Sequence, residues 1–236
     1  MTETLLDIKG LRAGYGGKPV LQGIDLSVAK GEIVAVIGRN GVGKSTLMKT
    51  LVGLVESMAG TIRLGGSELT GLPPFRRARL GIGYVPQGRD VFPRMSVREN
   101  LKVGESMRGH VSADAYERVY SLFPILKERA DQQAGTMSGG QQQQLAIGRV
   151  LIGSPELLLL DEPSEGIQPS IVQDIGRIIR RLNRESGMTI MFVEQNLDMI
   201  KALAQRCYVM DKGRIVAHVT PQELEDRDTI RKHLAV

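Results

Sequence analysis

The sequence predicts an α/β fold in which a mostly parallel core sheet carries an antiparallel β lobe and a helical insertion. Residues 33–37 (IVAVI) form an uninterrupted apolar run that leads straight into glycines and a helix, which is typical of a central strand in a covered sheet. Residues 24–28 instead alternate apolar and polar side chains, the pattern of a strand with one buried face. Helical patterns dominate residues 96–153, and no linker or repeat interrupts the order. We therefore expect a single domain over residues 1–236, with the helical insertion at about 88–153.

Composition supports a folded domain and excludes several other classes of protein. The chain has 236 residues, of which 42% are hydrophobic and 24% charged, close to the globular average and unlike a disordered or collagenous protein. No aliphatic stretch approaches the roughly 18 residues that cross a bilayer, and the first residues lack a secretory signal pattern. The single cysteine, Cys207, excludes an internal disulfide and suits a reducing cytosol. The formal net charge of +5 permits nucleic acid or anionic lipid as a partner without requiring either.

The remaining elements follow from local patterns along the chain. A short helix containing three arginines is expected before a strand at 82–85. Ser96 with Glu99, and Thr220 with Glu223, have the spacing of helix-starting capping boxes. Further predicted segments are a helix from Ser96 to about Met107, strands at 157–160, 188–193, 208–209 and 215–219, and helices at 171–182 and from about Asn196. Two groups of arginines are expected on solvated surfaces, namely Arg76, Arg77 and Arg79, and Arg177, Arg180, Arg181 and Arg184.

A glycine-rich segment joins the predicted strand at 33–37 to the following helix. Its sequence, GRNGVGKST, fits the phosphate-binding loop pattern, in which glycines let backbone N–H groups turn inward around a triphosphate. Lys44 then reaches the β and γ phosphates, and the hydroxyl of Ser45 is a ligand for Mg²⁺. The alternative is an ordinary glycine-rich turn, which the Lys–Ser pair disfavours. We expect ATP binding by Gly38, Asn40, Gly41, Gly43, Lys44, Ser45 and Thr46, with Lys44 also serving catalysis.

Two adjacent carboxylates stand at the carboxyl end of the predicted strand at 157–160. Open α/β sheets gather their ligands at this edge, so Asp161 is expected to serve Mg²⁺ through water. If strand geometry persists, Glu162 points the opposite way and is placed to polarise an attacking water as the catalytic base. The alternative is a pair of acids that cap a turn before Pro163. The phosphate loop upstream favours the catalytic interpretation.

Residues 137–141 (MSGGQ) resemble the LSGGQ signature of ATP-binding cassette (ABC) ATPases, with Met in place of the usual first Leu. The phosphate loop, the signature and the acid pair occur in that family's order, and the match runs over essentially the entire chain. The resemblance implies a P-loop NTPase fold of the ABC type and a two-fold dimer in which this segment faces ATP held by the opposite subunit. Ser138 and the N–H groups of the next two residues open a helix, which offers positive charge to a γ phosphate. The alternative is that Ser138 caps a plain helix. The binding residues expected here are Ser138, Gly139, Gly140 and Gln141.

The resemblance extends to two further candidate residues and to the helical insertion. Tyr15 resembles the aromatic residue that stacks on adenine, with a surface turn residue as the alternative. Gln87, after the predicted strand at 82–85, resembles the glutamine that touches Mg²⁺ and water and senses the membrane subunit; a solvated loop glutamine is the alternative. By the same resemblance, residues 88–137 receive a cytoplasmic helix of a membrane partner.

Two positions depart from the usual family pattern. The segment VEQN places Gln195 where the family usually has a switch histidine, and none of His110, His218 and His233 is nearby in the sequence. A glutamine forms hydrogen bonds but carries no positive charge, so weaker electrostatic stabilisation is expected from this catalytic position. The second departure is Gln168, at a position where aspartate is common. Both features are similar to the second ATPase subunit of branched-chain amino acid and urea or short-chain amide importers, and SEGIQPS with the tail RKHLAV favours the urea and amide branch.

The preferred interpretation is an ATPase that energises a membrane importer: ATP closes a dimer, closure moves the membrane subunits, and hydrolysis reopens it. The resemblance implies ATP and Mg²⁺ as cofactors, and transmembrane permease subunits and a second ABC ATPase subunit, identical or different, as partners. It also implies a peripheral location on the cytoplasmic side of the plasma membrane. One alternative is a cassette ATPase acting on nucleic acid, which usually carries a coiled-coil insertion or two tandem cassettes, so no nucleic acid is expected here. Another is a regulatory module without turnover, which the retained Glu162 disfavours.

Overall fold

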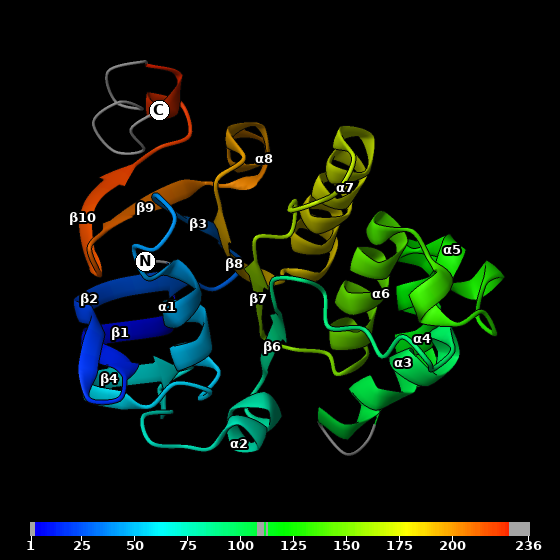
Figure 1. The fold of residues 1–236 in the computed structure, drawn as a ribbon, viewed down its shortest axis with the longest axis horizontal. Coiled ribbons are helices and arrows are strands. Elements are labelled where there is room, and N and C mark those ends of the chain that lie inside the picture. The colour runs from blue at the N-terminus through cyan, green and yellow to red at the C-terminus, as the bar shows by residue number, and fades with distance from the viewer. Residues whose placement is uncertain (1–2, 108–110, 112, 227–236) are drawn as a thin grey trace.

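The computed structural model describes residues 3–107, 111 and 113–226, which form two β-sheets flanked by helices (Figure 1). Within these residues the core sheet has the strand order β10-β9-β3-β8-β7-β6, and neighbouring strands are parallel except β10, which is antiparallel to β9. Its strands are β3 (Ile33–Ile37), β6 (Ile82–Val85), β7 (Leu157–Asp161), β8 (Thr189–Glu194), β9 (Arg206–Asp211) and β10 (Arg214–Val219). The α/β fold class predicted from the sequence is confirmed.

A second, antiparallel sheet stands beside the core sheet, as the predicted β lobe requires. Its order is β2-β1-β4-β5, and β1 pairs with both β2 and β4. The alternation predicted at 24–28 is present, because Ile24, Leu26 and Val28 are buried while Asp25 is exposed. β4 has no counterpart among the predicted strands, since the alternation in SMAGTIRL is weak. The strands are β1 (Thr4–Tyr15), β2 (Lys18–Ala29), β4 (Ser57–Leu64) and β5 (Ser67–Glu68).

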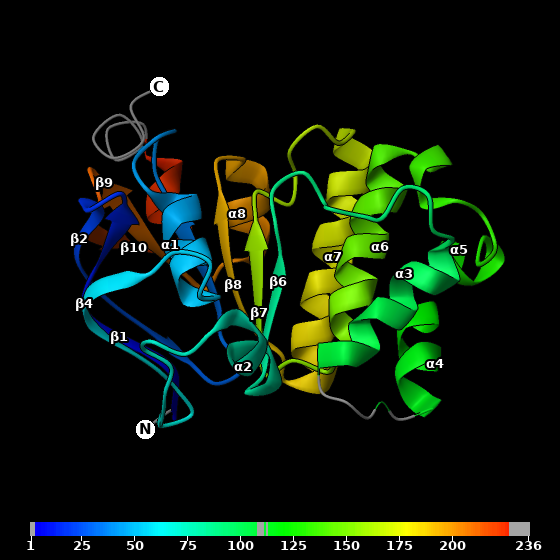
Figure 2. The same ribbon diagram turned by 60° about the horizontal axis from the view of Figure 1, so that its bottom comes forward.

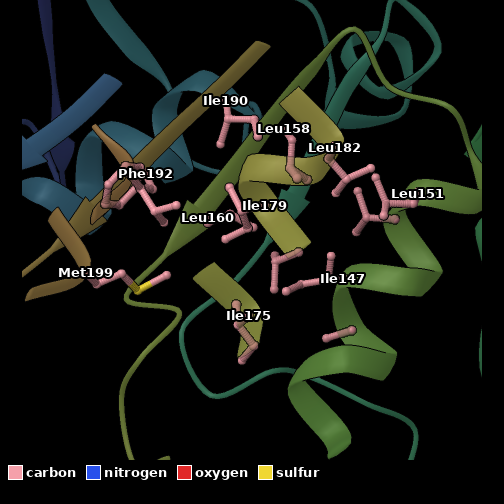
Figure 3. Packing of buried hydrophobic residues seen from close by; sticks show 14 of the residues in the cluster. Ile147, Leu151, Leu158, Leu160, Ile175, Ile179, Leu182, Ile190, Phe192 and Met199 are labelled. Carbon is pink, nitrogen blue, oxygen red and sulfur yellow. The ribbon is translucent and has the colours of Figure 1, made fainter. Parts of the chain in front are cut away.

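The core lies on both faces of the parallel sheet, because successive strand residues face opposite sides. On β7, Leu158 and Leu160 belong to the cluster that includes Ile175 and Ile179 of α7 (Figure 3). Leu159 belongs instead to the cluster formed with α1 and the antiparallel sheet. The covering helices are α1 (Lys44–Leu51), α7 (Pro169–Ser186) and α8 (Leu197–Leu203). This two-sided burial explains why the core strands are uninterrupted apolar runs.

The helical segment packs against α7 on the side away from the antiparallel sheet (Figure 2). It contains α3 (Val97–Val103), a 3₁₀ turn (Gly104–Met107), α4 (Ala113–Leu122), α5 (Pro124–Glu128) and α6 (Gly139–Ile152). The predicted capping box at the start of α3 is present, since Ser96 Oγ accepts from Glu99 N and Glu99 Oε2 accepts from Ser96 N. The α-helix ends at Val103, four residues earlier than expected, and the chain continues to Met107 as the tighter 3₁₀ turn. Gly104 lies so close to α6 that a Cβ there would be 2.1 Å from Arg149 O.

Arg77 contradicts the prediction that all the arginines of its segment are solvated. It lies on α2 (Pro74–Arg79), yet it is only 3% exposed. Its guanidinium donates to the carbonyl oxygens of Thr50, Leu51 and Leu72 at 2.7–3.0 Å. The last carbonyl groups of α1 lack partners within their own helix, so a buried arginine satisfies them. Arg76 and Arg79, Arg177, Arg180, Arg181 and Arg184 are exposed as expected.

At the C-terminal end of the described residues, the predicted capping pair is present but opens only a short turn. Thr220 Oγ1 accepts from Glu223 N, and Glu223 Oε2 accepts from Thr220 N, in front of a 3₁₀ turn (Glu223–Glu225). The tail RKHLAV, with His233, and His110 lie outside the described residues. Of the helices in the described part of the chain, none has both the length and the apolar character needed to span a membrane.

Candidate functional site

The carboxyl ends of four neighbouring strands bring most of the predicted site residues to one edge of the core sheet. β3 leads into the glycine-rich loop and α1, and its last residue pairs in register with Glu194 at the end of β8. Asp161 ends β7 opposite Val193, and Val85 ends β6 opposite Leu160. Parallel strands have their carboxyl ends on the same side, so residues far apart in the sequence meet here. The sequence places each residue at the end of its own strand, and the register brings them together.

The loop between β3 and α1 takes backbone conformations that its glycines permit. Gly38, Gly41 and Gly43 have φ values of 154°, 79° and 111°. At Gly38 a Cβ would also lie 2.3 Å from the carbonyl oxygen of Met210, so a side chain does not fit. Thr46 is buried on α1, whereas Asn40 is exposed at the loop. The loop therefore has the glycine-dependent backbone conformation that an anion cradle in front of a helix requires.

Lys44 is a buried cation at the start of α1. Its side chain is 4% exposed, and Nζ donates to the carbonyl oxygens of Gly38 at 2.8 Å and Arg39 at 3.0 Å. Nζ also lies 3.7 Å from Glu162 Oε1. Burial lowers the pKa of Lys44, and the negative charges of Glu162 and Asp161 oppose that shift. A buried ammonium whose two hydrogen bonds go to neutral carbonyl groups can exchange them for the oxygens of an anionic ligand, so Lys44 fits a phosphate-binding role.

Asp161 is a buried carboxylate with one hydrogen-bond donor on each oxygen. Ser45 Oγ lies 3.1 Å from Oδ1, and Tyr84 Oη lies 3.1 Å from Oδ2. Burial raises the pKa of Asp161, while these two hydrogen bonds act in the opposite direction. A carboxylate beside a serine hydroxyl is an oxygen-only donor set, which is the kind that Mg²⁺ prefers. These residues therefore fit the ion that the sequence predicts.

Glu162 occupies a different environment from Asp161, although the reason differs from the one expected. The prediction assumed that the strand continues through Glu162, but β7 ends at Asp161 and Glu162 has a left-handed φ of 48°. Its side chain approaches Lys44 and accepts a hydrogen bond from Gln195 Nε2 at 2.9 Å. The two acids are therefore separated by a backbone turn, and Glu162 faces the phosphate loop.

Gln195 lies within this cluster and does not cap the following helix. Its Nε2 donates to Asn40 Oδ1 at 2.7 Å as well as to Glu162 Oε1. The cap of α8 is Asn196, whose Oδ1 accepts from Met199 N at 3.1 Å. The geometry therefore assigns the cap of α8 to Asn196 and not to Gln195.

The signature segment begins α6 with a complete capping box. Ser138 Oγ accepts from Gln141 N, and Gln141 Oε1 accepts from Ser138 N at 3.1 Å. Arg89 packs against this helix start, because a Cβ on Gly139 would lie 2.8 Å from Arg89 Nη1. Its other terminal nitrogen donates to the carbonyl oxygens of Glu165 and Gly166, in the loop after the acid pair. Gly140 is buried, and Ser138 is exposed.

Tyr15 and Gln87 lie at the surface and form no hydrogen bond to the Lys44–Glu162 cluster in the described structure. Tyr15 ends β1 and is 52% exposed. Gln87 is exposed in the turn that follows β6. Both positions leave the side chain accessible to a ligand or partner.

Two residues at this edge have no role in the sequence prediction. Tyr84 reaches Asp161 from the neighbouring strand. Glu194, 2% exposed, accepts from the backbone N–H groups of Ser164, Gln195 and Asn196 at 2.8–3.0 Å and so joins the two loops that follow β7 and β8. The sequence does contain a signal that could have identified Glu194: like Asp161, it is an acid at the carboxyl end of an apolar strand.

A phosphate loop after a central strand, with a buried aspartate at the end of a neighbouring strand, defines a P-loop nucleoside triphosphatase. The ABC transporter family model matches residues 21–165, and the chain belongs to the ABC transporter family. It is accordingly an ATP-binding and ATP-hydrolysing subunit, as the resemblance predicts.

Individual relatives agree over nearly the full chain. A high-affinity branched-chain amino acid transport ATP-binding protein of Pseudomonas aeruginosa, BraG, is 49% identical, with 92% of this chain and 93% of the relative covered. A lipopolysaccharide export system ATP-binding protein of Escherichia coli, LptB, is 37% identical, with 97% and 96% covered. A solved ATP-binding cassette of an ABC transporter in its ADP conformation superposes with a TM-score of 0.83 at 28% identity, covering 98% of each chain.

Proposed function

We propose that the chain hydrolyses ATP to energise a membrane importer of branched-chain amino acids. The observation that carries this proposal is the 49% identity to the Pseudomonas aeruginosa branched-chain amino acid transport protein, which extends over 92% of the chain. A probable branched-chain amino acid transport ATP-binding protein of Archaeoglobus fulgidus, LivF, is 35% identical over 94% of the chain. The second candidate cargo is urea or a short-chain amide, which the SEGIQPS segment favours.

The nucleotide site of this proposal is built on α1 and β7. The N–H groups of the loop from Gly38 to Gly43, and of Thr46, surround the phosphates, and Lys44 exchanges its carbonyl partners for phosphate oxygens. Ser45 and Asp161 would hold Mg²⁺, which would supply positive charge to the phosphates, and Gln87, exposed in the turn after β6, would be a further ligand. The support is the donor set: a buried ammonium, a hydroxyl and a buried carboxylate meet at one sheet edge.

Glu162 is assigned as the general base for the attacking water. Its Oε1 is anchored by Gln195 Nε2 and lies near Lys44, so the carboxylate stands between the phosphate loop and the switch position. Gln195 positions this carboxylate and accepts a hydrogen bond from the water. Electrostatic stabilisation at Gln195 is weaker than a protonated histidine provides, because an amide carries no charge.

The complete site requires a second cassette and a membrane partner. Ser138 caps the start of α6 at an exposed position, which fits a phosphate supplied from outside the protomer. Gly140 and Gln141 support this helix start, and exposed Tyr15 is available to stack on adenine. Permease subunits dock on the segment that contains residues 88–137 and hold the ATPase peripherally on the cytoplasmic side of the membrane.

Two alternative functions, export and a role on nucleic acid, have weaker support than import. The 37% identical Escherichia coli relative is named for lipopolysaccharide export, so sequence similarity to it favours an exporter less strongly than the 49% identity favours an importer. A role on nucleic acid has weak support, because two of the exposed arginines of α7, Arg177 and Arg181, are paired with Asp174 and Glu185 on their own helix.

Reconstitution tests the proposal directly. The chain is purified with the permease subunits encoded beside it and placed in proteoliposomes, and ATP-dependent uptake of radiolabelled leucine, urea and acetamide is measured, with Glu162→Gln as the matched inactive control. Uptake of leucine that requires ATP and intact Glu162 supports the proposal. Uptake of urea or acetamide alone would establish the second candidate, and export or no transport with full ATPase activity would contradict both.

A further inference from the structure

Tyr84 and Asp161 meet because of the register between β6 and β7. The two strands are parallel, and Tyr84 is paired with Leu159. Asp161 is two residues further along β7, and side chains two residues apart point to the same face. Leu159 belongs to the buried cluster on the α1 side of the sheet, and the half-buried Tyr84 packs against that cluster. The phenol of Tyr84 therefore extends past Leu159 to Asp161, the next residue of β7 on the same face. Its Oη lies 3.1 Å from Asp161 Oδ2.

The Asp161 carboxylate is held from two sides. Ser45 on α1 donates to Oδ1 at 3.1 Å, while Tyr84 on β6 donates to Oδ2. Asp161 is only 2% exposed, so water does not freely replace either donor. Leaving a buried carboxylate oxygen without a hydrogen-bond donor costs free energy. Loss of one donor therefore favours rotation of the carboxylate toward another donor. The Tyr84 ring is itself packed against apolar neighbours, which fixes the direction of its hydroxyl.

We propose that Tyr84 is a positioning residue for the metal site: its hydroxyl holds Asp161 Oδ2 so that Oδ1 remains directed at Ser45, where Mg²⁺ would be held. This inference rests on the proposed role of Asp161 as the Mg²⁺ carboxylate. Mg²⁺ demands nearly ideal geometry, so the orientation of its few protein ligands matters. Groups that orient metal ligands in this way typically affect metal affinity about 10–100-fold.

The test removes only the hydroxyl. Tyr84→Phe keeps the packed ring, and binding of Mn²⁺ in the presence of ADP is followed by electron paramagnetic resonance on the full chain. A matched control is Tyr116→Phe, which removes another tyrosine-to-carboxylate hydrogen bond, from Tyr116 Oη to Glu105 Oε1 at 2.5 Å in the helical segment. We expect about a tenfold weaker Mn²⁺ affinity for Tyr84→Phe and no change for Tyr116→Phe, with ADP affinity in EDTA unchanged in both.

The outcomes separate this inference from the proposed function. If Asp161→Asn abolishes Mn²⁺ binding while Tyr84→Phe behaves as Tyr116→Phe does, Tyr84 has no positioning role and the metal site stands. If Asp161→Asn itself leaves Mn²⁺ affinity unchanged, the proposed metal site is wrong and this inference falls with it. Melting curves in EDTA check that each variant is folded; a loss of Mn²⁺ affinity that merely tracks a lower melting temperature in both phenylalanine variants also overturns the proposal.

Discussion

The side-chain amide nitrogen of Gln195 lies 2.9 Å from Glu162 Oε1 and 2.7 Å from Asn40 Oδ1, so both of its N–H groups are engaged. The polar atom that remains on this side chain is its carbonyl oxygen, which accepts hydrogen bonds and donates none. An acceptor binds an O–H group of water but not a phosphate oxygen. In the proposed mechanism, Gln195 therefore holds Glu162 and orients water through this oxygen.

Replacing Gln195 tests this arrangement. We expect Gln195→Ala to lower kcat about tenfold, equivalent to about 1.4 kcal/mol, with ATP affinity little changed, because Glu162 loses its anchor. Gln195→His should be tolerated, since an imidazole N–H also reaches a carboxylate and can be protonated. Steady-state kinetics on folded protein provides the measurement.

The neighbouring helix cap supplies a matched control for that variant. Asn196→Ala removes the cap of α8 and should cost about 1 kcal/mol of stability with little loss of kcat. The assignment of Gln195 would be wrong if Gln195→Ala instead lowered the melting temperature and left kcat unchanged.

Glu162→Gln should retain ATP binding, lose hydrolysis and accumulate a dimer with trapped ATP. The amide keeps the shape of the carboxylate but does not take a proton from water. Size-exclusion chromatography with ATP and Mg²⁺ detects this dimer. Nucleotide-free protein should elute as a monomer, because ATP joins the two halves of each site. Lys44→Ala should instead lose nucleotide affinity and remain monomeric. Near-normal turnover by Glu162→Gln would remove Glu162 from the role of base.

Arg77→Met should destabilise the protein by about 2–4 kcal/mol, because it removes the guanidinium donor from two carbonyl groups at the end of α1 and from that of Leu72 before α2. Arg76→Met is the matched control on the same helix, and its exposed position predicts a change within about 0.5 kcal/mol. Urea denaturation measures both variants. Equal stabilities would mean that water replaces the Arg77 hydrogen bonds.

Cys207 should be unreactive in the native protein. The thiol is 1% exposed on β9, and burial raises the pKa of Cys207 to about 12. At pH 8 iodoacetamide should therefore modify the native chain at least about a hundredfold more slowly than the urea-unfolded chain, whose thiol has a pKa of about 8.5. Mass spectrometry of quenched samples measures the two rates, and rapid labelling of folded protein would contradict the burial of this side chain.

The same thiol makes stability depend on alkaline pH. The native state keeps a proton that the unfolded chain releases, so the stabilisation is fully present below about pH 8.5 and is lost progressively as pH rises toward 12. Cys207→Ala should flatten this part of the pH dependence. An unchanged slope between pH 8.5 and 10 would assign the alkaline loss of stability to other groups.

The sequence alone determined the features that depend on neighbouring residues. The phosphate loop and the capping pairs at Ser96 and Thr220 are local, because the partners in each lie within six residues of one another along the chain. The apolar run at 33–37 likewise predicted a covered central strand, which β3 confirmed.

The tertiary structure decided which distant side chains meet. Asn40 and Gln195 are 155 residues apart, and Tyr84 and Asp161 are 77 apart, yet each pair forms a hydrogen bond. Their distances depend on strand register and on how α1 packs over the sheet, which no single segment encodes. Arg77 shows the same dependence, because an arginine among exposed arginines becomes buried only when the end of α1 packs beside it. Local spacing identifies the chemistry, and long-range packing sets the geometry in which that chemistry operates.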